Sequence, residues 1–386
     1  MGQHTVREKN GSEGSRSGEG SQGLGFDMEH NLFCTADAEG RFTSLNAAWE
    51  RVLGWSRAEL MARPFLDFVH PEDVERTRRA AAQVADTDYE LSRFENRYRT
   101  KDGGWRWLSW SARSDGTTWF AIAFDITESK RSETWVRQAL DEDRLVAYTQ
   151  PIMDQRNRRI VQEELLVRMR LDSGGVAPPA DFVPQAESLG LIGVVDHWMT
   201  ATGLARARAG RRVEVNVSAR SIADEATADD LVALVSESRA VAGALVFEIT
   251  ETAAIENLDA ARDFSERMIR LGCGFALDDF GTGYGSLTQL RKLSVQFLKI
   301  DRSFVTGMTT NAEDQALVRS VVAIARAHGI RTVAEGVEDR PTLTALRHCE
   351  VDYVQGYLIG RPRPLDGPVP VAAPTRGLDP QPVAGA

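Results

Sequence analysis

The chain has 386 residues and a formal net charge of -10 at pH 7. That length allows two domains with separate cores, and the acidic balance argues against a nucleic-acid polymer as partner, because proteins that bind one are normally basic. Since no apolar run is long enough to cross a bilayer and the first ten residues lack the apolar core of a secretion signal, we expect a cytoplasmic protein without a membrane partner.

Both ends of the chain are poor in large apolar side chains. Residues 1–25 are mostly Gly, Ser and charged residues, and residues 366–386 are rich in Pro, Gly and Ala. Such segments cannot offset the entropy that is lost on ordering. We therefore predict a disordered leader over residues 1–25 and a disordered tail over residues 366–386.

The first folded region is predicted to begin with two strands, followed by a helix that turns Trp49 and Leu53 toward a core. Alternating strands follow, joined by a hairpin turn at Asp102 to Gly104. Residues 26–130 resemble a PAS domain, and the matching motifs are Asn46, Gly54 to Ser56, His70 to Asp73, Arg97 to Gly103, Trp107, and Asp125 to Glu128. The resemblance implies an α+β sensor domain that supplies a regulatory input and takes part in dimerisation.

The ligand of this PAS domain is unknown from the sequence. His70 lies in a turn beside Pro71 and Asp73, where a helix-capping or surface role is favoured over haem ligation. No motif of the NCRFLQ type surrounds Cys34, which argues against a flavin photosensor of the light-oxygen-voltage class. We interpret all three cysteines, which are far apart and lack CxxC spacing, as buried, reduced thiols.

A connecting helix is predicted over residues 131–142. The segment is charged, and its apolar positions are sparse: Trp135, Val136 and Leu140. Such a pattern is usual for a solvated helix face. Between a sensor and an effector, a helix of this kind can also transmit a twist or a shift.

From about residue 143, short apolar runs end repeatedly in a polar or charged side chain. Stretches of helical periodicity follow these runs, so strands and helices alternate. The polar positions are Asn216, Glu248, Glu251, Asp278, Asp279, Lys299, Glu335 and Gln355. Because the strand ends of a closed parallel barrel converge on one face, we predict an α/β domain with a TIM-like (β/α)8 barrel.

Two of these runs carry charged residues at informative spacings. Asp278 and Asp279 are adjacent, and neighbouring carboxylates repel each other unless cations lie between them, which favours a metal site over a simple helix cap. Glu164 and Arg168 are four residues apart and share one face of a strand. They form either an ion pair or part of a phosphate site, for which arginine is well suited.

Residues 143–365 resemble an EAL domain, the family of cyclic di-GMP phosphodiesterases. The E-x-L-x-R signature is present at Glu164, Leu166 and Arg168, with Leu165 in place of the central Ala. Further matches follow in family order: Gln150 to Ile152, Asp181 to Glu187, Val215 to Ser218, Glu248 to Glu251, Asp278 to Tyr284, Leu298 to Val305, Val333 to Glu338, and Gln355 to Tyr357.

The resemblance implies a two-metal site made of oxygen ligands, which suit Mg²⁺ or Mn²⁺. The residues expected to hold the first ion are Glu164, Asn216, Glu248 and Asp278. The second ion is expected to be held by Asp278 and Asp279, with Glu335 beside it.

The resemblance also implies roles for the remaining residues. Lys299 is expected to be catalytic, with Glu164 and Glu335; the structural alternative is that Lys299 only pairs with Asp301 or another acid. Substrate contacts are expected from Gln150, Arg168, Asp279 and Gln355. Glu251 is expected to anchor the loop after Asp279.

The implied reaction is metal-dependent hydrolysis of cyclic di-GMP to linear pGpG, regulated by the PAS domain, in a homodimer formed through both domains. The alternative is a non-catalytic cyclic di-GMP receptor, which is typical of EAL-like domains that have lost ligands, whereas here every acidic position is filled. A third hypothesis, a PAS-driven interaction scaffold, leaves the convergent carboxylates without a role.

Overall fold

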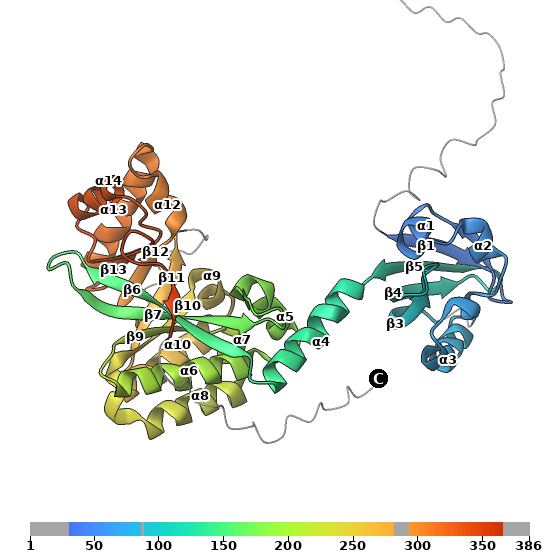
Figure 1. Ribbon diagram of the computed structural model, residues 1–386, viewed down its shortest axis with the longest axis horizontal. Coiled ribbons are helices and arrows are strands. Elements are labelled where there is room, and N and C mark those ends of the chain that lie inside the picture. Colours follow the sequence, from blue (N-terminus) through green and yellow to red (C-terminus); the bar gives the residue numbers. More distant parts are fainter. Residues whose placement is uncertain (1–30, 86–88, 282–292, 366–386) are drawn as a thin grey trace, which may run out of the picture. The chain divides into compact units, whose positions relative to one another are not determined.

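The computed structural model describes residues 31–85, 89–281 and 293–365 (Figure 1). The predicted leader and tail lie outside these ranges. The chain divides into two compact units, Met1–Arg131 and Ser132–Ala386. Among the described residues, no helix has both the length and the apolar character needed to cross a membrane.

The first unit is built on a five-stranded antiparallel sheet in the order β2-β1-β5-β4-β3. Its strands are β1 Leu32–Ala36, β2 Phe42–Leu45, β3 Leu91–Arg99, β4 Trp105–Ser114 and β5 Trp119–Asp125. Its helices are α1 Ala48–Leu53, α2 Arg57–Met61 and α3 Val74–Val84, with 3-10 turns at Phe65–Phe68 and Pro71–Asp73. The predicted hairpin is confirmed, since Arg99 pairs with Trp105 across the turn.

One face of this sheet carries the core of the first unit. Trp49, Tyr98 and Trp110 are buried there, and the rings of Tyr98 and Trp110 lie 5.3 Å apart. A cavity of about 70 Å³ lies beside them, with a lining that is almost entirely apolar. This volume is well below the roughly 300–1,000 Å³ of ordinary small-molecule sites. Cys34 lines the cavity as a buried free thiol, as predicted.

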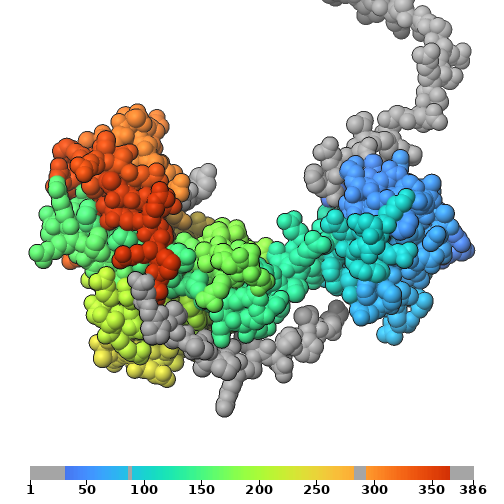
Figure 2. Space-filling model, viewed as in Figure 1, coloured from blue at the N-terminus to red at the C-terminus, as the bar shows by residue number. Residues whose placement is uncertain are grey.

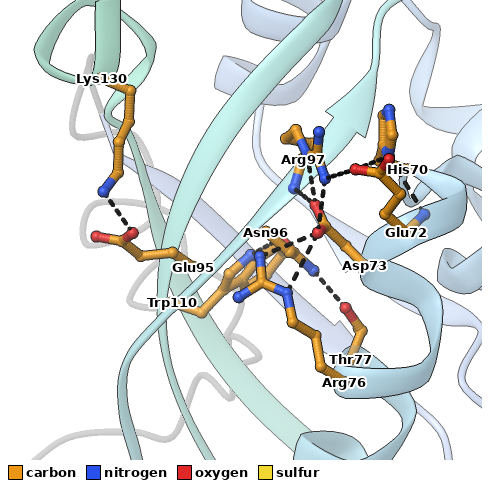
Figure 3. Close-up of polar contacts among 10 residues, drawn as sticks. All are labelled: His70, Glu72, Asp73, Arg76, Thr77, Glu95, Asn96, Arg97, Trp110 and Lys130. Atoms are coloured by element: carbon orange, nitrogen blue, oxygen red, sulfur yellow. Dashed lines mark hydrogen bonds and ion pairs between the residues drawn. The ribbon is translucent and has the colours of Figure 1, made fainter. Parts of the chain in front are cut away.

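A polar network joins α3 to β3 (Figure 3). The buried carboxylate of Asp73 accepts hydrogen bonds from the backbone N–H of Arg97 at 2.9 Å, from its Nε at 2.8 Å and from Arg76 Nε at 3.2 Å. Burial by itself would raise the pKa of Asp73, but the Arg97 bonds outweigh it and lower the pKa to about 2. The neighbouring His70 caps the turn at Pro71–Asp73 by accepting from the Glu72 N–H, which confirms the predicted capping role.

Arg97→Ala should destabilise the first unit by roughly 2–3 kcal/mol, because it removes two side-chain donors from a buried carboxylate. The folded-state pKa of Asp73 lies below its ordinary value of 3.8. The hydrogen bonds to the ionised carboxylate therefore contribute their full stabilisation of the folded unit above about pH 4, and this contribution is lost as the pH falls toward 2. Urea unfolding of the full chain, followed by tryptophan fluorescence, measures both effects, because six of the eight tryptophans lie in this unit.

The matched control for this variant is Arg78→Ala. It removes an exposed ion pair with Glu75 on α3 and should change stability by less than about 0.5 kcal/mol. Equal losses of unfolding free energy in Arg97→Ala and Arg78→Ala would show that the Asp73 network does not stabilise the unit.

The second unit is a closed barrel of eight strands in the order β6-β14-β13-β12-β11-β10-β9-β7, and β7 pairs back with β6. The strands are β6 Leu145–Asp154, β7 Ile160–Arg170, β9 Val213–Asn216, β10 Leu245–Thr250, β11 Gly274–Phe280, β12 Phe297–Ile300, β13 Arg331–Ala334 and β14 Tyr353–Gln355. Two short strands, β8 Val176–Ala177 and β15 Arg363–Pro364, extend it beside β7 and β6. The predicted TIM-like barrel is confirmed.

One strand departs from the all-parallel pattern that we expected. β6 runs antiparallel to both β7 and β14. The reason is local: β6 and β7 are consecutive strands joined by a short turn at residues 155–159, and strands connected in this way must run in opposite directions. The pairing of β14 with β6 closes the barrel, and Figure 2 shows the C-terminal part of the described chain, in red, beside green surface from the beginning of this unit.

Helices surround the barrel (Figure 1). They are α5 Val183–Ser188, α6 Ile192–Arg208, α7 Ala219–Ala223, α8 Glu225–Glu237, α9 Glu251–Glu256, α10 Leu258–Leu271, α12 Arg302–Gly307, α13 Ala312–Ala327 and α14 Arg340–His348, with 3-10 turns at Pro179–Asp181 and Arg239–Ala244. α4 Thr127–Asp141 precedes β6, and its Val136 and Ala139 are buried in the core of this unit. The main core lies between strands and helices. A separate apolar cluster fills one end of the barrel interior: Ile152, Val246, Ala276, Phe297, Val333 and Tyr353.

Candidate functional site

The candidate site lies at the carboxyl ends of the parallel strands, beyond the apolar cluster. Each predicted side chain comes from a different strand: Glu164 from the middle of β7, and the others from at or near the carboxyl ends, namely Asn216 from β9, Glu248 from β10, Asp278 from β11, Lys299 from β12 and Glu335 from the residue after β13. Apolar and polar residues two positions apart in a strand face the same side. The pairs Val246 and Glu248, and Phe297 and Lys299, place charge directly above the apolar cluster.

Lys299 is the centre of the site. It is 0% exposed, and its Nζ lies 2.7 Å from Glu335 Oε1 and 2.8 Å from Glu248 Oε2. Asp278 Oδ1 at 3.5 Å and Glu164 Oε2 at 3.6 Å complete the group. The alternative partner, Asp301, instead caps α12 through Ser303. The structure thus places Lys299 among the predicted metal ligands.

The site holds more negative charge than one ammonium can balance. Burial opposes the charged form of Lys299, but the surrounding carboxylates outweigh it and raise the pKa of the ammonium well above its usual value. Burial also raises the pKa of Glu335 to about 8, although Lys299 opposes this. The pKa of Glu248 is likewise raised by burial. Several acids at one mouth therefore hold protons in the absence of other cations.

The paired aspartates lie on a bulge in β11. The register against β12 shifts between Leu277 and Phe280, and Asp279 has a left-handed backbone with φ 55°. A bulge turns side chains away from strict alternation, so both carboxylates reach the same mouth. Burial and the neighbouring Asp278 raise the pKa of Asp279 to about 6. One oxygen from each of Asp278, Asp279 and Glu335 falls within 4.8 Å of the others.

These residues fit divalent cations. Glu248 Oε1 and Asp278 Oδ1 are buried and accept no hydrogen bond, and such atoms are costly unless an ion or a water satisfies them. The remaining ligands of the first predicted ion also meet, since Asn216 Nδ2 donates to Glu164 Oε1 at 2.8 Å. Carboxylate and amide oxygens suit Mg²⁺ or Mn²⁺.

The predicted substrate residues lie at one side of the mouth. Gln355 Nε2 donates to Gln150 Oε1 at 3.1 Å and to Glu164 Oε2 at 2.5 Å. The guanidinium of Arg168 lies over the ring of Tyr148, 5.5 Å from its centroid, and makes no carboxylate ion pair within the described residues. Within the described residues, Glu164 and Arg168 thus form no direct ion pair within 4 Å, although the Glu164 charge favours the charged guanidinium.

Glu251 begins α9 and is buried. Its Oε2 accepts a hydrogen bond of 2.9 Å from the backbone N–H of Gly281. Gly281 is the last described residue before the segment 282–292, so Glu251 contacts the residue directly before the predicted loop, and the loop itself lies outside the described residues.

Sequence reasoning missed two polar residues inside the barrel. Glu214 is 0% exposed and accepts a hydrogen bond from Gln162 Nε2. Burial raises the pKa of Glu214, which lies against Glu248. The available signal was spacing: Gln162 and Glu214 lie two residues before Glu164 and Asn216, and so on the same strand faces.

A model described as the EAL domain matches residues 133–362, more than half of the chain. The chain belongs to the EAL domain family. A second model, described as the PAS fold, matches residues 42–117 in the first unit.

Curated relatives of this EAL protein are named cyclic di-GMP phosphodiesterases. NbdA of Pseudomonas aeruginosa is 36% identical over 248 residues, which are 62% of this chain and 31% of the relative. PdeF of Escherichia coli is 34% identical over 236 residues, 60% of this chain and 31% of the relative. The chain thus spans about a third of the length of these relatives.

Solved EAL domains share the barrel. A structure titled as the MucR phosphodiesterase in complex with c-di-GMP has a TM-score of 0.57 and 32% identity, covering 61% of this chain and 98% of that one. An EAL domain protein from Listeria monocytogenes has a TM-score of 0.56 and 30% identity, covering 61% of this chain and 94% of the other.

Mn²⁺ affinity of this EAL unit should rise with pH. Glu335 and Asp279, with pKa values of about 8 and about 6, are protonated below those values, and an ion must displace the protons. We expect the dissociation constant to fall roughly tenfold or more between pH 6 and pH 8.5. Isothermal titration calorimetry in buffers of different ionisation enthalpy counts the released protons, and a pH-independent affinity without proton release would contradict the expectation.

Proposed function

We propose that this protein hydrolyses one phosphodiester bond of cyclic di-GMP to give linear pGpG, using two Mg²⁺ or Mn²⁺ ions. The observation that carries the proposal is the convergence of acids from separate strands on one buried lysine. The names of the curated relatives supply the substrate class.

The ligand roles follow the predicted sets. Glu164, Asn216, Glu248 and Asp278 would hold one ion, and Asp278, Asp279 and Glu335 the other. When bound, such ions neutralise the phosphate and lower the pKa of a water molecule at the mouth. Anion repulsion is the main obstacle to attack on a phosphodiester, so this charge balance addresses the barrier directly.

The chain's own side chains position the reactants. Lys299 Nζ, held by Glu248 and Glu335, offsets negative charge at the phosphate and donates a hydrogen bond to the attacking water. Glu164 and Glu335 serve both as ligands and as partners that orient this ammonium. Gln150, Arg168, Asp279 and Gln355 would contact the substrate, and the Arg168 guanidinium suits a phosphate oxygen.

Glu164→Ala should abolish hydrolysis while the wild-type protein converts cyclic di-GMP to pGpG with Mg²⁺ or Mn²⁺. Loss of a direct ligand should lower kcat by more than about 100-fold, since even outer partners of ligands cost 10–100-fold. Chromatography of the nucleotide products measures turnover, and Arg326→Ala, which removes an exposed ion pair with Glu350, is the control. Tight binding without product under either metal would favour the receptor alternative.

The regulatory part of the proposal assigns residues 26–130 to a PAS sensor, 131–142 to a connecting helix and 143–365 to the effector of a cytoplasmic homodimer. Deleting residues 1–130 should change the turnover rate several-fold and weaken dimerisation. Initial rates and light scattering after size exclusion measure the two outcomes. If the truncated protein keeps the turnover rate and the oligomeric state of the full chain, the result argues against regulation by this region.

A further inference from the structure

The Asp181 to Glu187 motif lies outside the ligand sets, yet the structure connects it to the site. Its last residue, Glu187, lies on α5, and Asp196 lies on α6. Both carboxylates meet Ser218, which follows β9 and caps the N-terminus of α7. Figure 1 shows α5, α6 and α7 on the outside of the barrel, and α6 contacts both α5 and α7.

Ser218 is held by two acids at once. Its backbone N–H donates to Asp196 Oδ2 at 2.9 Å, and its hydroxyl donates to Glu187 Oε1 at 2.7 Å. The same hydroxyl accepts a hydrogen bond from the Arg220 N–H at 3.1 Å. Both donors of this residue are therefore engaged by carboxylates, and charge-assisted bonds of this kind are stronger than neutral ones.

The serine lies two residues beyond a metal ligand. The backbone N–H of Val217 donates to the backbone O of Glu248 at 2.9 Å, so the segment 216–218 is held to β10. Asn216 itself is exposed at the mouth, and its amide Nδ2 is bonded to Glu164. The direction of the Asn216 side chain thus depends on how the backbone on either side of it is held.

Asp196 is an unusual residue for a purely structural contact. It is 5% exposed and has no Lys or Arg within 4 Å among the residues that the structure describes. Burial raises the pKa of its carboxyl to about 7, with a further contribution from Glu187. A buried acid without a cation lowers stability. Its presence beside a ligand-bearing turn favours a role in the site.

We propose that Glu187 and Asp196 are positioning residues, which clamp Ser218 and so aim the Asn216 amide oxygen at the divalent cation. The inference rests on the proposed function, because that function makes Asn216 a ligand. Neither acid touches substrate or ion in this arrangement; each acts through the serine backbone or hydroxyl.

The test compares Mn²⁺ binding, measured by calorimetry on the full chain, with kcat and KM for cyclic di-GMP. Glu187→Ala and Asp196→Ala should each weaken Mn²⁺ binding and lower kcat by roughly 10–100-fold, with KM little changed. Glu187→Gln and Asp196→Asn keep an acceptor oxygen and should stay within about threefold of the wild type. A purely structural role would not give this split between kcat and KM.

A double-variant cycle tests whether Glu187 acts through the serine. Ser218→Ala should reproduce the Glu187→Ala loss, and the double variant should be no worse than either single one. Additive losses would overturn the clamp. Asn311→Ala is the control: it removes a comparable side-chain cap, on α13, and should lower the melting temperature without changing Mn²⁺ affinity.

The outcomes separate this inference from the proposed function. If the wild-type protein is active and the Ala variants bind Mn²⁺ with unchanged affinity, the clamp is overturned and the proposed activity is not affected. If the wild-type protein binds Mn²⁺ but does not turn over cyclic di-GMP, the proposed activity is overturned. The comparison of Mn²⁺ affinities between the variants and the wild type still tests the clamp. A wild-type protein that binds no Mn²⁺ overturns both. If Asp196→Ala fails to fold, the partly exposed Glu187 decides through its own variants.

Discussion

The buried ammonium of Lys299 lies between carboxylates from four different strand segments, and the arrangement of the site depends on this charge balance. One lysine cannot neutralise Glu164, Glu248, Asp278 and Glu335 together, so the mouth favours protons or divalent cations. A barrel can sustain such a concentration of charge because each acid is held by a separate strand. The backbone hydrogen bonds of the sheet resist the mutual repulsion.

The barrel interior is divided into layers by the two-residue period of its strands. Val246, Ala276 and Phe297 close one end, and Glu248, Asp278 and Lys299, two positions further along, line the other. The apolar layer excludes water from beneath the site, which strengthens electrostatic interactions there. Stability and chemistry are thus assigned to opposite ends of the same strands.

In the PAS unit, a buried carboxylate is compensated in a different way. Asp73 is fully compensated by arginine donors, so its pKa falls, whereas burial and neighbouring acids raise the pKa values at the barrel mouth. One arrangement holds α3 to β3, and the other keeps carboxylates available for ions. At the C-terminal edge of the unit, Lys130 near the start of α4 pairs with Glu95 on β3 at 2.8 Å (Figure 3).

Much of this protein could be predicted from its sequence. The alternation of apolar runs and helical stretches predicted the barrel, and the polar residues near the ends of most strands predicted the acids of its mouth, because the period of a strand or a helix is a local property. What required the tertiary structure was non-local: the pairing of β6 with β14, the bulge that turns Asp279, and the meeting of Glu187 and Asp196 at Ser218. These features depend on contacts between segments distant in the chain, and no pattern within a single segment specifies which distant segment it will contact.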